Sequence, residues 1–228
     1  MMRTIAQWME HFRALYGERN ECYFQGLDRR IIFLLLGIRM LRRAIKHHHD
    51  KDVAIMLASV LARTFMVAQH FSQLPFVEAV TSKYMHGHCS YCGQSACACP
   101  ESFRPPPRYG AQTSTNALTL QAFSRQIAAV YGERNRAKPL PVLFDRLNDE
   151  VVELIELEEC MHYGTIQPEE ARTKFAYELA DVLAWIAAIA DVQGVDLEQA
   201  CSRQYGGGCH NCCSFPCNCP PYAARSST

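Results

Sequence analysis

Two stretches of the sequence decide the fold, LNDEVVELIEL at 147–157 and YELADVLAWIAAIADVQGVDLEQA at 177–200. In both, apolar residues recur at spacings of three and four, which is the period of an amphipathic α-helix. The second stretch consists mostly of strong helix formers, and Gly194 ends its long helix. Asp196 and Gln199 form a capping-box pattern that starts another helix. The sequence therefore predicts two long helices followed by a short one.

Four carboxylates stand in pairs on the two long helices. Glu150 and Glu153 are three residues apart on the first helix. Glu178 and Asp181 have the same spacing on the second, so each pair projects from one helix face. Antiparallel packing would bring the four groups together as the oxygen ligands that Mg²⁺ or Mn²⁺ prefers. A lone pair is usually a solvated helix face, but Asp181 lies in an apolar helix, where only a cation would offset desolvation and repulsion.

An internal repeat organises the chain. The pentapeptide YGERN occurs at 16–20 and at 131–135, and the cysteine spacing C-x2-C-x4-C-x-C follows each copy. Two landmarks in the same order predict a duplication, and the absence of a convincing period-two run predicts two all-α units. The segment between them is rich in Pro and small polar residues, as linkers are. We expect a first unit at 1–100, a linker at 101–115, a second unit at 116–220 and a flexible C-terminus at 221–228.

The repeated cysteine pattern predicts a structural zinc site at the end of each unit. Four thiols within 11 residues, close to glycines, match tetrahedral Zn²⁺ coordination and leave no open position for catalysis. Disulfides are the alternative, and they would fit an oxidising compartment. The predicted ligands are Cys89, Cys92, Cys97 and Cys99 in the first unit, and Cys209, Cys212, Cys217 and Cys219 in the second. Histidines that could substitute as ligands are His86, His88 and His210. Cysteines outside the pattern that are expected to be buried are Cys22, Cys160 and Cys201.

The second unit resembles the MazG-like, all-α nucleoside triphosphate pyrophosphohydrolases. The resemblance rests on DEVVE at 149–153, ELAD at 178–181 and a YG-x-GC-x-x-C-x-x-x-PC-x-C tail at 205–219. The family signature is EExxE, a spacer and then ExxD, and here Asp149 replaces the first Glu. The resemblance implies that a nucleoside triphosphate, ribo or deoxy, is hydrolysed to a monophosphate and pyrophosphate by water attacking the α-phosphate. It assigns Mg²⁺ binding to Glu150, Glu153, Glu178 and Asp181.

Basic and aromatic residues near these acids are candidates for substrate contacts. Arg136 and Lys138 follow the second YGERN and are predicted to contact the triphosphate, with a solvated cationic loop as the alternative. Where the family often has a Lys before the tyrosine of the tail, this chain has Gln204. Trp185 lies one turn after Asp181, where it would either stack on a base or belong to the core.

The first unit has lost the acids. Superposing the units by eye puts Phe33 and Leu36 opposite the first acidic pair, and Met56 and Ser59 opposite the second. No carboxylate metal site is therefore expected there. That unit instead carries a run of cationic residues, which is either a solvated helix face or a complement to its acidic twin. These are Arg29, Arg30, Arg39, Arg42, Arg43 and Lys46.

The resemblance also implies a dimer with substrate held between subunits. A tandem duplication would place that dimer in one chain as an intrachain pseudo-dimer, and two such pseudo-dimers could assemble further into a homo-oligomer. We therefore expect the second unit to hold the metal, and the first to supply packing surface and phosphate-binding arginines.

The composition of the chain limits the classes of protein to which it can belong. The chain has 228 residues, 49% of them hydrophobic, and zero net charge, which excludes disorder and argues against whole-surface attraction to nucleic acid or membrane. The charge is divided, +6 over residues 1–110 and −6 over 111–228. The charged N-terminus and the short apolar run at 31–38 predict a cytoplasmic protein. The alternative to an enzyme is a catalytically silent, zinc-stabilised protein whose basic first unit contacts nucleic acid or a protein partner.

Overall fold

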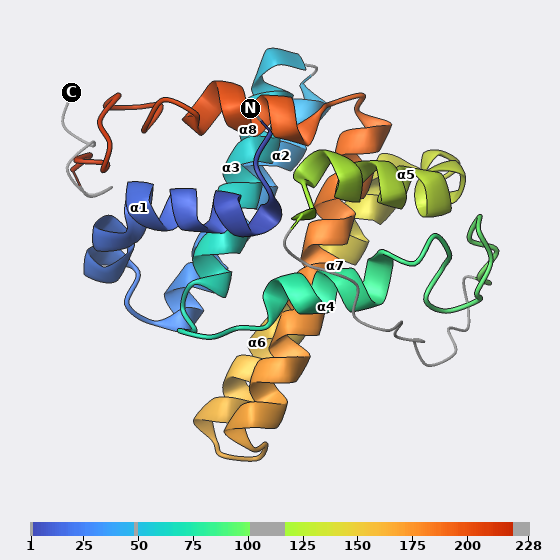
Figure 1. The fold of residues 1–228 in the computed structure, drawn as a ribbon, viewed down its shortest axis with the longest axis horizontal. Helices are drawn as coiled ribbons and strands as arrows, with labels where there is room; N and C mark the ends of the chain where they lie inside the picture. Colours follow the sequence, from blue (N-terminus) through green and yellow to red (C-terminus); the bar gives the residue numbers. More distant parts are fainter. Residues whose placement is uncertain (1, 48–49, 101–116, 221–228) are drawn as a thin grey trace.

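The computed structural model describes residues 2–47, 50–100 and 117–220, with the backbone alone at 50 and 51. Over these ranges the chain forms α-helices and no strand, which confirms the prediction of an all-α fold (Figure 1). None of the described helices is both long and apolar enough to cross a membrane. The predicted linker and C-terminus lie outside the described residues. The helices are α1 (Ile5–Tyr23), α2 (Leu27–Lys46), α3 (Asp50–Ala68), α4 (Phe76–Tyr84), α5 (Leu120–Arg136), α6 (Leu140–His162), α7 (Pro168–Val192) and α8 (Leu197–Tyr205).

The described helices form two sets, α1–α4 and α5–α8. The residues that precede the first helix of each set pair with one another. Thr4 and Thr119 cap α1 and α5, each accepting a hydrogen bond from a backbone amide in the first turn. The two threonines also form an antiparallel bridge, in which the Ile5 amide donates to the Leu118 carbonyl at 2.8 Å. They are 115 residues apart, as are the two copies of YGERN. Such a pairing of equivalent residues is what the predicted duplication would give if its two units were related by a local pseudo-two-fold axis.

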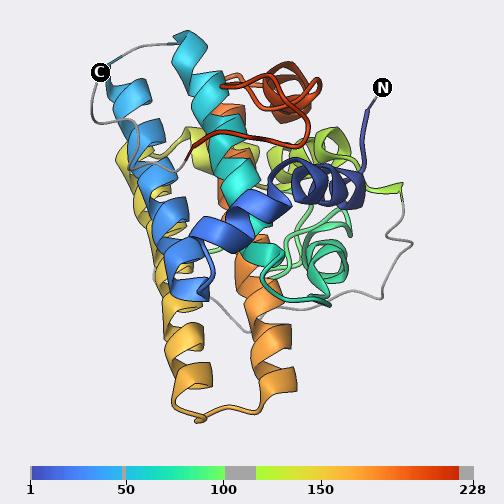
Figure 2. The same ribbon diagram turned by 90° about the vertical axis from the view of Figure 1, so that its left-hand side faces the viewer.

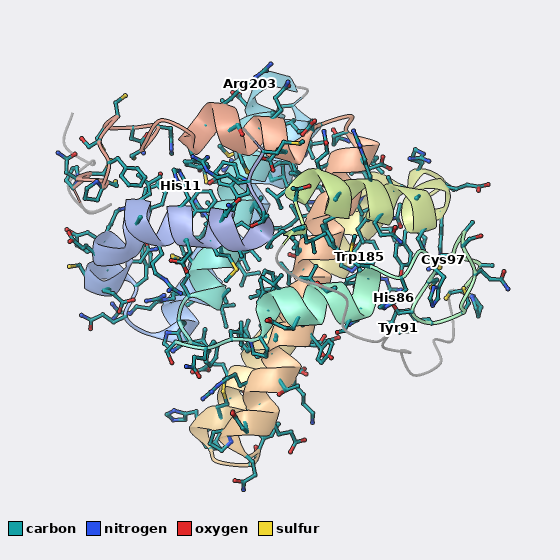
Figure 3. The ribbon with its side chains drawn as sticks, in the orientation of Figure 1. His11, His86, Tyr91, Cys97, Trp185 and Arg203 are labelled. Atoms are coloured by element: carbon teal, nitrogen blue, oxygen red, sulfur yellow. The ribbon has the colours of Figure 1, made fainter. Side chains whose placement is uncertain are left out.

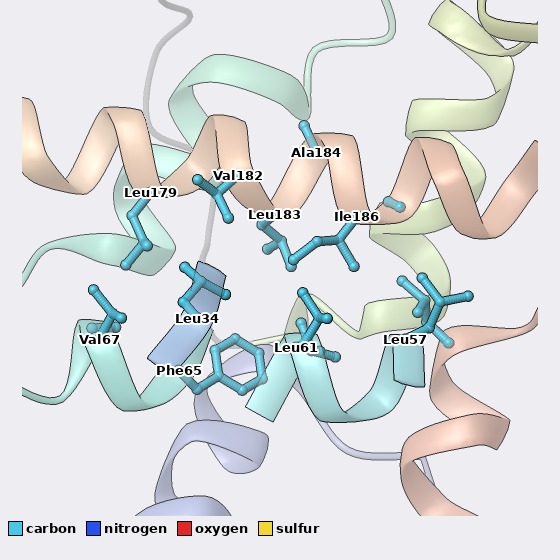
Figure 4. Packing of buried hydrophobic residues seen from close by; sticks show 14 of the residues in the cluster. Leu34, Leu57, Leu61, Phe65, Val67, Leu179, Val182, Leu183, Ala184 and Ile186 are labelled. Carbon is cyan, nitrogen blue, oxygen red and sulfur yellow. The ribbon is translucent and has the colours of Figure 1, made fainter. Parts of the chain in front are cut away.

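Four long helices form the centre of the molecule. α2 packs on α3 and α6 packs on α7, and the two helix pairs meet through contacts of α2 with α6 and α3 with α7 (Figure 2). Leu57, Leu61 and Phe65 of α3 face α7 across this contact (Figure 4). These side chains are fully buried, as are Leu183 and Ile186 of α7. One continuous apolar core therefore joins the two sets of helices.

Each short helix and each cysteine loop packs on the other set of helices. α4 packs on α7 and α5 of the other set, whereas α8 packs on α3 of the other set and also on α5 of its own. The cysteine loop after α4 docks on α5, where the Cys97 amide donates to the Val130 carbonyl at 2.8 Å. The loop after α8 docks on α1 in the same way, from the Cys217 amide to the Leu15 carbonyl at 2.8 Å. This exchange brings residues of the first half to the acids of the second.

Two expectations for the first half are wrong in detail. Arg30 does not belong to a solvated cationic face, because it is 1% exposed and its guanidinium donates to the Phe24 and Met66 carbonyls and pairs with Glu21. Cys22 is exposed, because it lies off the buried stripe of α1. Among the cationic residues of α2 expected to complement the acidic half, Arg42 does so through an exposed ion pair, with its Nη1 3.9 Å from Asp145 Oδ1.

Candidate active site

The acids of α6 and α7 meet between these two helices. Glu150, Glu178 and Asp181 each place a carboxylate oxygen within 4.8 Å of the others. Glu150 and Asp181 are buried, at 7% and 6% exposure. Glu153, one turn after Glu150, is exposed and lies beside Glu178 at the edge of the cluster. Helical spacing thus brings three of the four predicted acids together and leaves the fourth at their border.

Two side chains from the first half close the cluster. The ammonium of Lys83 donates to one carboxylate oxygen of Asp181, and the hydroxyl of Tyr84 donates to the other. Both are buried, at 3% and 7% exposure, and they are the last two residues of the exchanged helix α4. Neither residue was predicted from the sequence. The sequence did contain a signal for Lys83. The family often has a Lys before the tyrosine of the tail, and in this chain that Lys is found in the first unit, as Lys83 before Tyr84, whereas the second unit has Gln204 before Tyr205.

The site carries an excess of negative charge. Burial, reinforced by the charge of Asp181, raises the pKa of Glu150 to about 7 and that of Glu178 to about 8. Burial works against the charge of Lys83, but Asp181 outweighs it and holds the lysine pKa above its ordinary value. One ammonium faces three clustered carboxylates, so a divalent cation would relieve the repulsion that remains.

A pocket opens beside the acids, and we call it the acidic pocket. Trp185 forms part of its wall and donates a hydrogen bond from Nε1 to Glu150 Oε1 at 3.0 Å, so the ring does more than fill the core. Tyr91 and Cys97 of the first cysteine loop form another part of the wall, and Figure 3 shows them on the same side of the molecule as Trp185. The space between its walls is about 530 Å³, a figure that includes solvent at the open mouth.

The second YGERN supplies the polar rim of the acidic pocket. Tyr131, Arg134 and Asn135 all line it, and Arg134 Nη1 donates to Cys97 Sγ at 3.6 Å. The structure does not bring the predicted substrate contacts to this place. Arg136 pairs with Asp191 at 2.6 Å on the surface, and neither it nor Lys138 lines the pocket. The sequence predicted a basic contact next to the second YGERN, but its spacing does not show that Arg134, and not Arg136, faces the pocket.

Each cysteine cluster could hold a metal such as zinc. In each, the four sulfur atoms lie within 4.8 Å of one another, and all twelve cysteines of the chain are free thiols. Neighbouring sulfur atoms within the two clusters are 3.5 to 3.9 Å apart, and a tetrahedron with Zn–S bonds of about 2.3 Å has edges of about 3.8 Å. In the second cluster the Ser214 amide lowers the pKa of the Cys212 thiol to about 6, which favours the metal-binding thiolate.

The histidines near the clusters are not among the grouped ligands. His86 contacts the Ser82 carbonyl at 2.5 Å and His88 contacts the His86 carbonyl at 2.8 Å. Within the part of the chain that the structure describes, the groups found at the two predicted zinc sites consist of cysteines alone.

No family model, curated protein or solved structure matches the chain. The resemblance to MazG-like enzymes therefore remains a prediction that rests on the acids and the tail.

Proposed function

We propose that the protein is a Mg²⁺-dependent nucleoside triphosphate pyrophosphohydrolase with one active site per chain. Water would attack the α-phosphorus of a nucleoside triphosphate, the bond to the bridging oxygen of the β-phosphate would break, and monophosphate and pyrophosphate would leave. The observation that carries the proposal is the cluster of buried Glu150, half-buried Glu178 and buried Asp181 beside a pocket. Three carboxylates with one ammonium are costly to bury unless a cation joins them.

The acids would hold the metal. Their all-oxygen donor set suits Mg²⁺ or Mn²⁺, and Glu153 at the border offers a further oxygen. Bound Mg²⁺ would neutralise and orient the polyphosphate. A carboxylate of the cluster would orient or deprotonate the water.

Other residues would position these groups and the substrate. Tyr84 and Lys83 fix the orientation of Asp181, and Trp185 does the same for Glu150 through its indole N–H. Arg134 lies in the pocket wall, where its guanidinium can turn from Cys97 to a phosphate oxygen. The ring of Trp185 gives the same wall a flat apolar surface for a base.

The test is pyrophosphate release from a panel of canonical and modified NTPs and dNTPs with Mg²⁺ or Mn²⁺. Glu150→Gln and Asp181→Asn should each lower release about 100-fold or more, because each removes a charge from the metal cluster. Glu156→Gln is the matched control, since Glu156 lies on the same helix but is exposed. Release that survives both cluster variants, or no release from any nucleotide together with no divalent binding in calorimetry, would overturn the proposal.

A further inference from the structure

A second pocket lies where such a pseudo-two-fold axis would place the counterpart of the acidic pocket, and we call it the basic pocket. Tyr16, Arg19 and Asn20 of the first YGERN line it, as their equivalents line the acidic pocket. Tyr205 at the end of α8 takes the place of Tyr84 at the end of α4. The basic pocket is also wider, at about 950 Å³ including its mouth against about 530 Å³ for the acidic one.

The acids are replaced there by groups that do not bind cations. Phe33 stands in the place of Glu150, and Ser59 stands in the place of Asp181, hydrogen-bonded to Tyr205. Arg63 occupies the position of Trp185, 8% exposed. Its Nη1 donates to the Phe33 carbonyl at 2.6 Å, and its guanidinium lies 3.8 Å from the centre of the Phe33 ring. These contacts hold a permanent cation in place at the pocket wall.

Arg19 adds a second cation, and one of its hydrogen-bond donors is not used. Its Nε is buried and has no hydrogen-bond partner among the described residues. Its equivalent Arg134 differs, because that guanidinium contacts a cysteine sulfur in the acidic pocket. A buried donor without an acceptor is costly, and an oxyanion in the pocket would satisfy it.

The positive charge continues out of the basic pocket. An adjoining groove shares Arg19 and Arg63 with it and adds Arg39 and Arg43 from α2. No carboxylate is among the residues that line either cavity in the described part of the chain. Four guanidinium groups along one path suit an extended anion with several charges, because guanidinium matches phosphate oxygens in geometry and charge.

We propose that the basic pocket and its groove bind a phosphate chain without a divalent cation. The ligand class is a nucleoside triphosphate or an inorganic polyphosphate, held intact because the groups that would bind a metal are absent. The pentapeptide YGERN supports this, because its three pocket-facing residues are identical in both halves whereas the acids remain in only one. The proposal stands on the charge of this pocket and does not depend on hydrolysis in the other.

The test is calorimetric titration of the full chain with inorganic triphosphate, and separately with ATP, GTP, CTP and UTP, in buffer without added divalent cation or chelator. We expect one equivalent to bind. Arg19→Gln should weaken binding about tenfold or more, because it removes a charged contact. Arg134→Gln is the matched control at the equivalent position, and it should leave this metal-independent binding unchanged.

Ser59→Asp gives a second test that does not remove a cation. It places a carboxylate beside Arg63 and should abolish metal-independent binding, while unchanged melting would show that the chain still folds. Equal binding of triphosphate and nucleotides would assign recognition to the phosphates, and tighter binding of one nucleotide would add a base contact. No binding of any ligand, or equal weakening by Arg19→Gln and Arg134→Gln, would overturn the proposal.

Discussion

Lys83 connects the two halves at the level of a single side chain. It is buried against Asp181 and supplies the one ammonium of the cluster. In the proposed enzyme, Lys83→Met should lower pyrophosphate release about 100-fold, because Asp181 loses the partner that fixes it and the phosphates lose a nearby cation. Gln204→Met, at the equivalent position of α8, is the matched control and should be silent. Equal activity of the two variants in the release assay would contradict a role for Lys83.

Charge repulsion among the acids makes a second prediction at this scale. Burial and the charge of Asp181 raise the pKa of Glu178 to about 8. Between the ordinary carboxyl pKa of 4.5 and this value, Glu178 is protonated in the folded protein and ionised in the unfolded chain. Stability in metal-free buffer therefore falls as the pH rises from about 4.5 through 8. Glu178→Gln removes the part of this loss that Glu178 causes and leaves the part caused by Glu150, whose pKa is raised to about 7.

At pH 8.5 without Mg²⁺, Glu178→Gln should therefore melt above the wild type, by about 2–4 °C for each kcal/mol of repulsion removed. Adding Mg²⁺ should raise the melting temperature of the wild type but not of the variant. Glu156→Gln, which changes an exposed acid on α6, should respond to Mg²⁺ as the wild type does. Scanning calorimetry measures both effects, and equal Mg²⁺ responses of wild type and Glu178→Gln would argue against metal at these acids.

The sequence predicted the acids but missed the lysine for a physical reason. Glu150 and Asp181 are placed by the period of two neighbouring helices, which spacing encodes directly. Lys83 reaches Asp181 only because α4 packs on the other half, and no local pattern encodes that exchange. The inward arginine, Arg134 instead of Arg136, depends in the same way on the position of the first cysteine loop.

The cysteine loops act at the level of elements, because each fixes a short exchanged helix onto the other half. The loop after α8 is tied to α1 by the bond from the Cys217 amide to the Leu15 carbonyl. If zinc holds that loop, Cys212→Ser should lower zinc content by one ion per chain and the melting temperature by about 10 °C or more, since a structural Zn²⁺ contributes several kcal/mol.

The neighbouring residue gives a matched control for that experiment. Cys213 is exposed and lies outside the four grouped thiols, so Cys213→Ser should change neither zinc content nor melting temperature. Metal analysis and thermal melting check both variants. A wild-type chain purified without zinc, or a melting temperature indifferent to a strong chelator, would count against zinc in these loops.

Helix positions were predictable from pattern, whereas partners were not. α6 and α7 extend beyond the predicted helices, and Asp196 caps α8 by accepting a hydrogen bond from the Gln199 amide at 2.9 Å. These features depend on local chemistry. The docking of each cysteine loop on α1 or α5 depends on long-range packing, so the repeat predicted two similar units without predicting their exchanged ends.

For the whole molecule, the two halves share one apolar core and one acidic site. Leu61 of α3 and Ile186 of α7 are fully buried at the contact between halves, so either half alone would expose a large apolar face. A free second half would pair with a copy of itself to cover that face. Such a pair would place Gln204 and Tyr205 where the full chain has Lys83 and Tyr84.

The claim that the first half completes the active site is best tested by measuring pyrophosphate release by residues 117–220 alone. We predict release at least about 100-fold below that of the full chain, because no residue replaces Lys83. Adding residues 1–100 should restore release, whereas adding the same segment with Lys83→Met should not. Within residues 117–220, Gln204→Lys should raise release without any first half. Full activity of unmodified residues 117–220 alone would contradict the account.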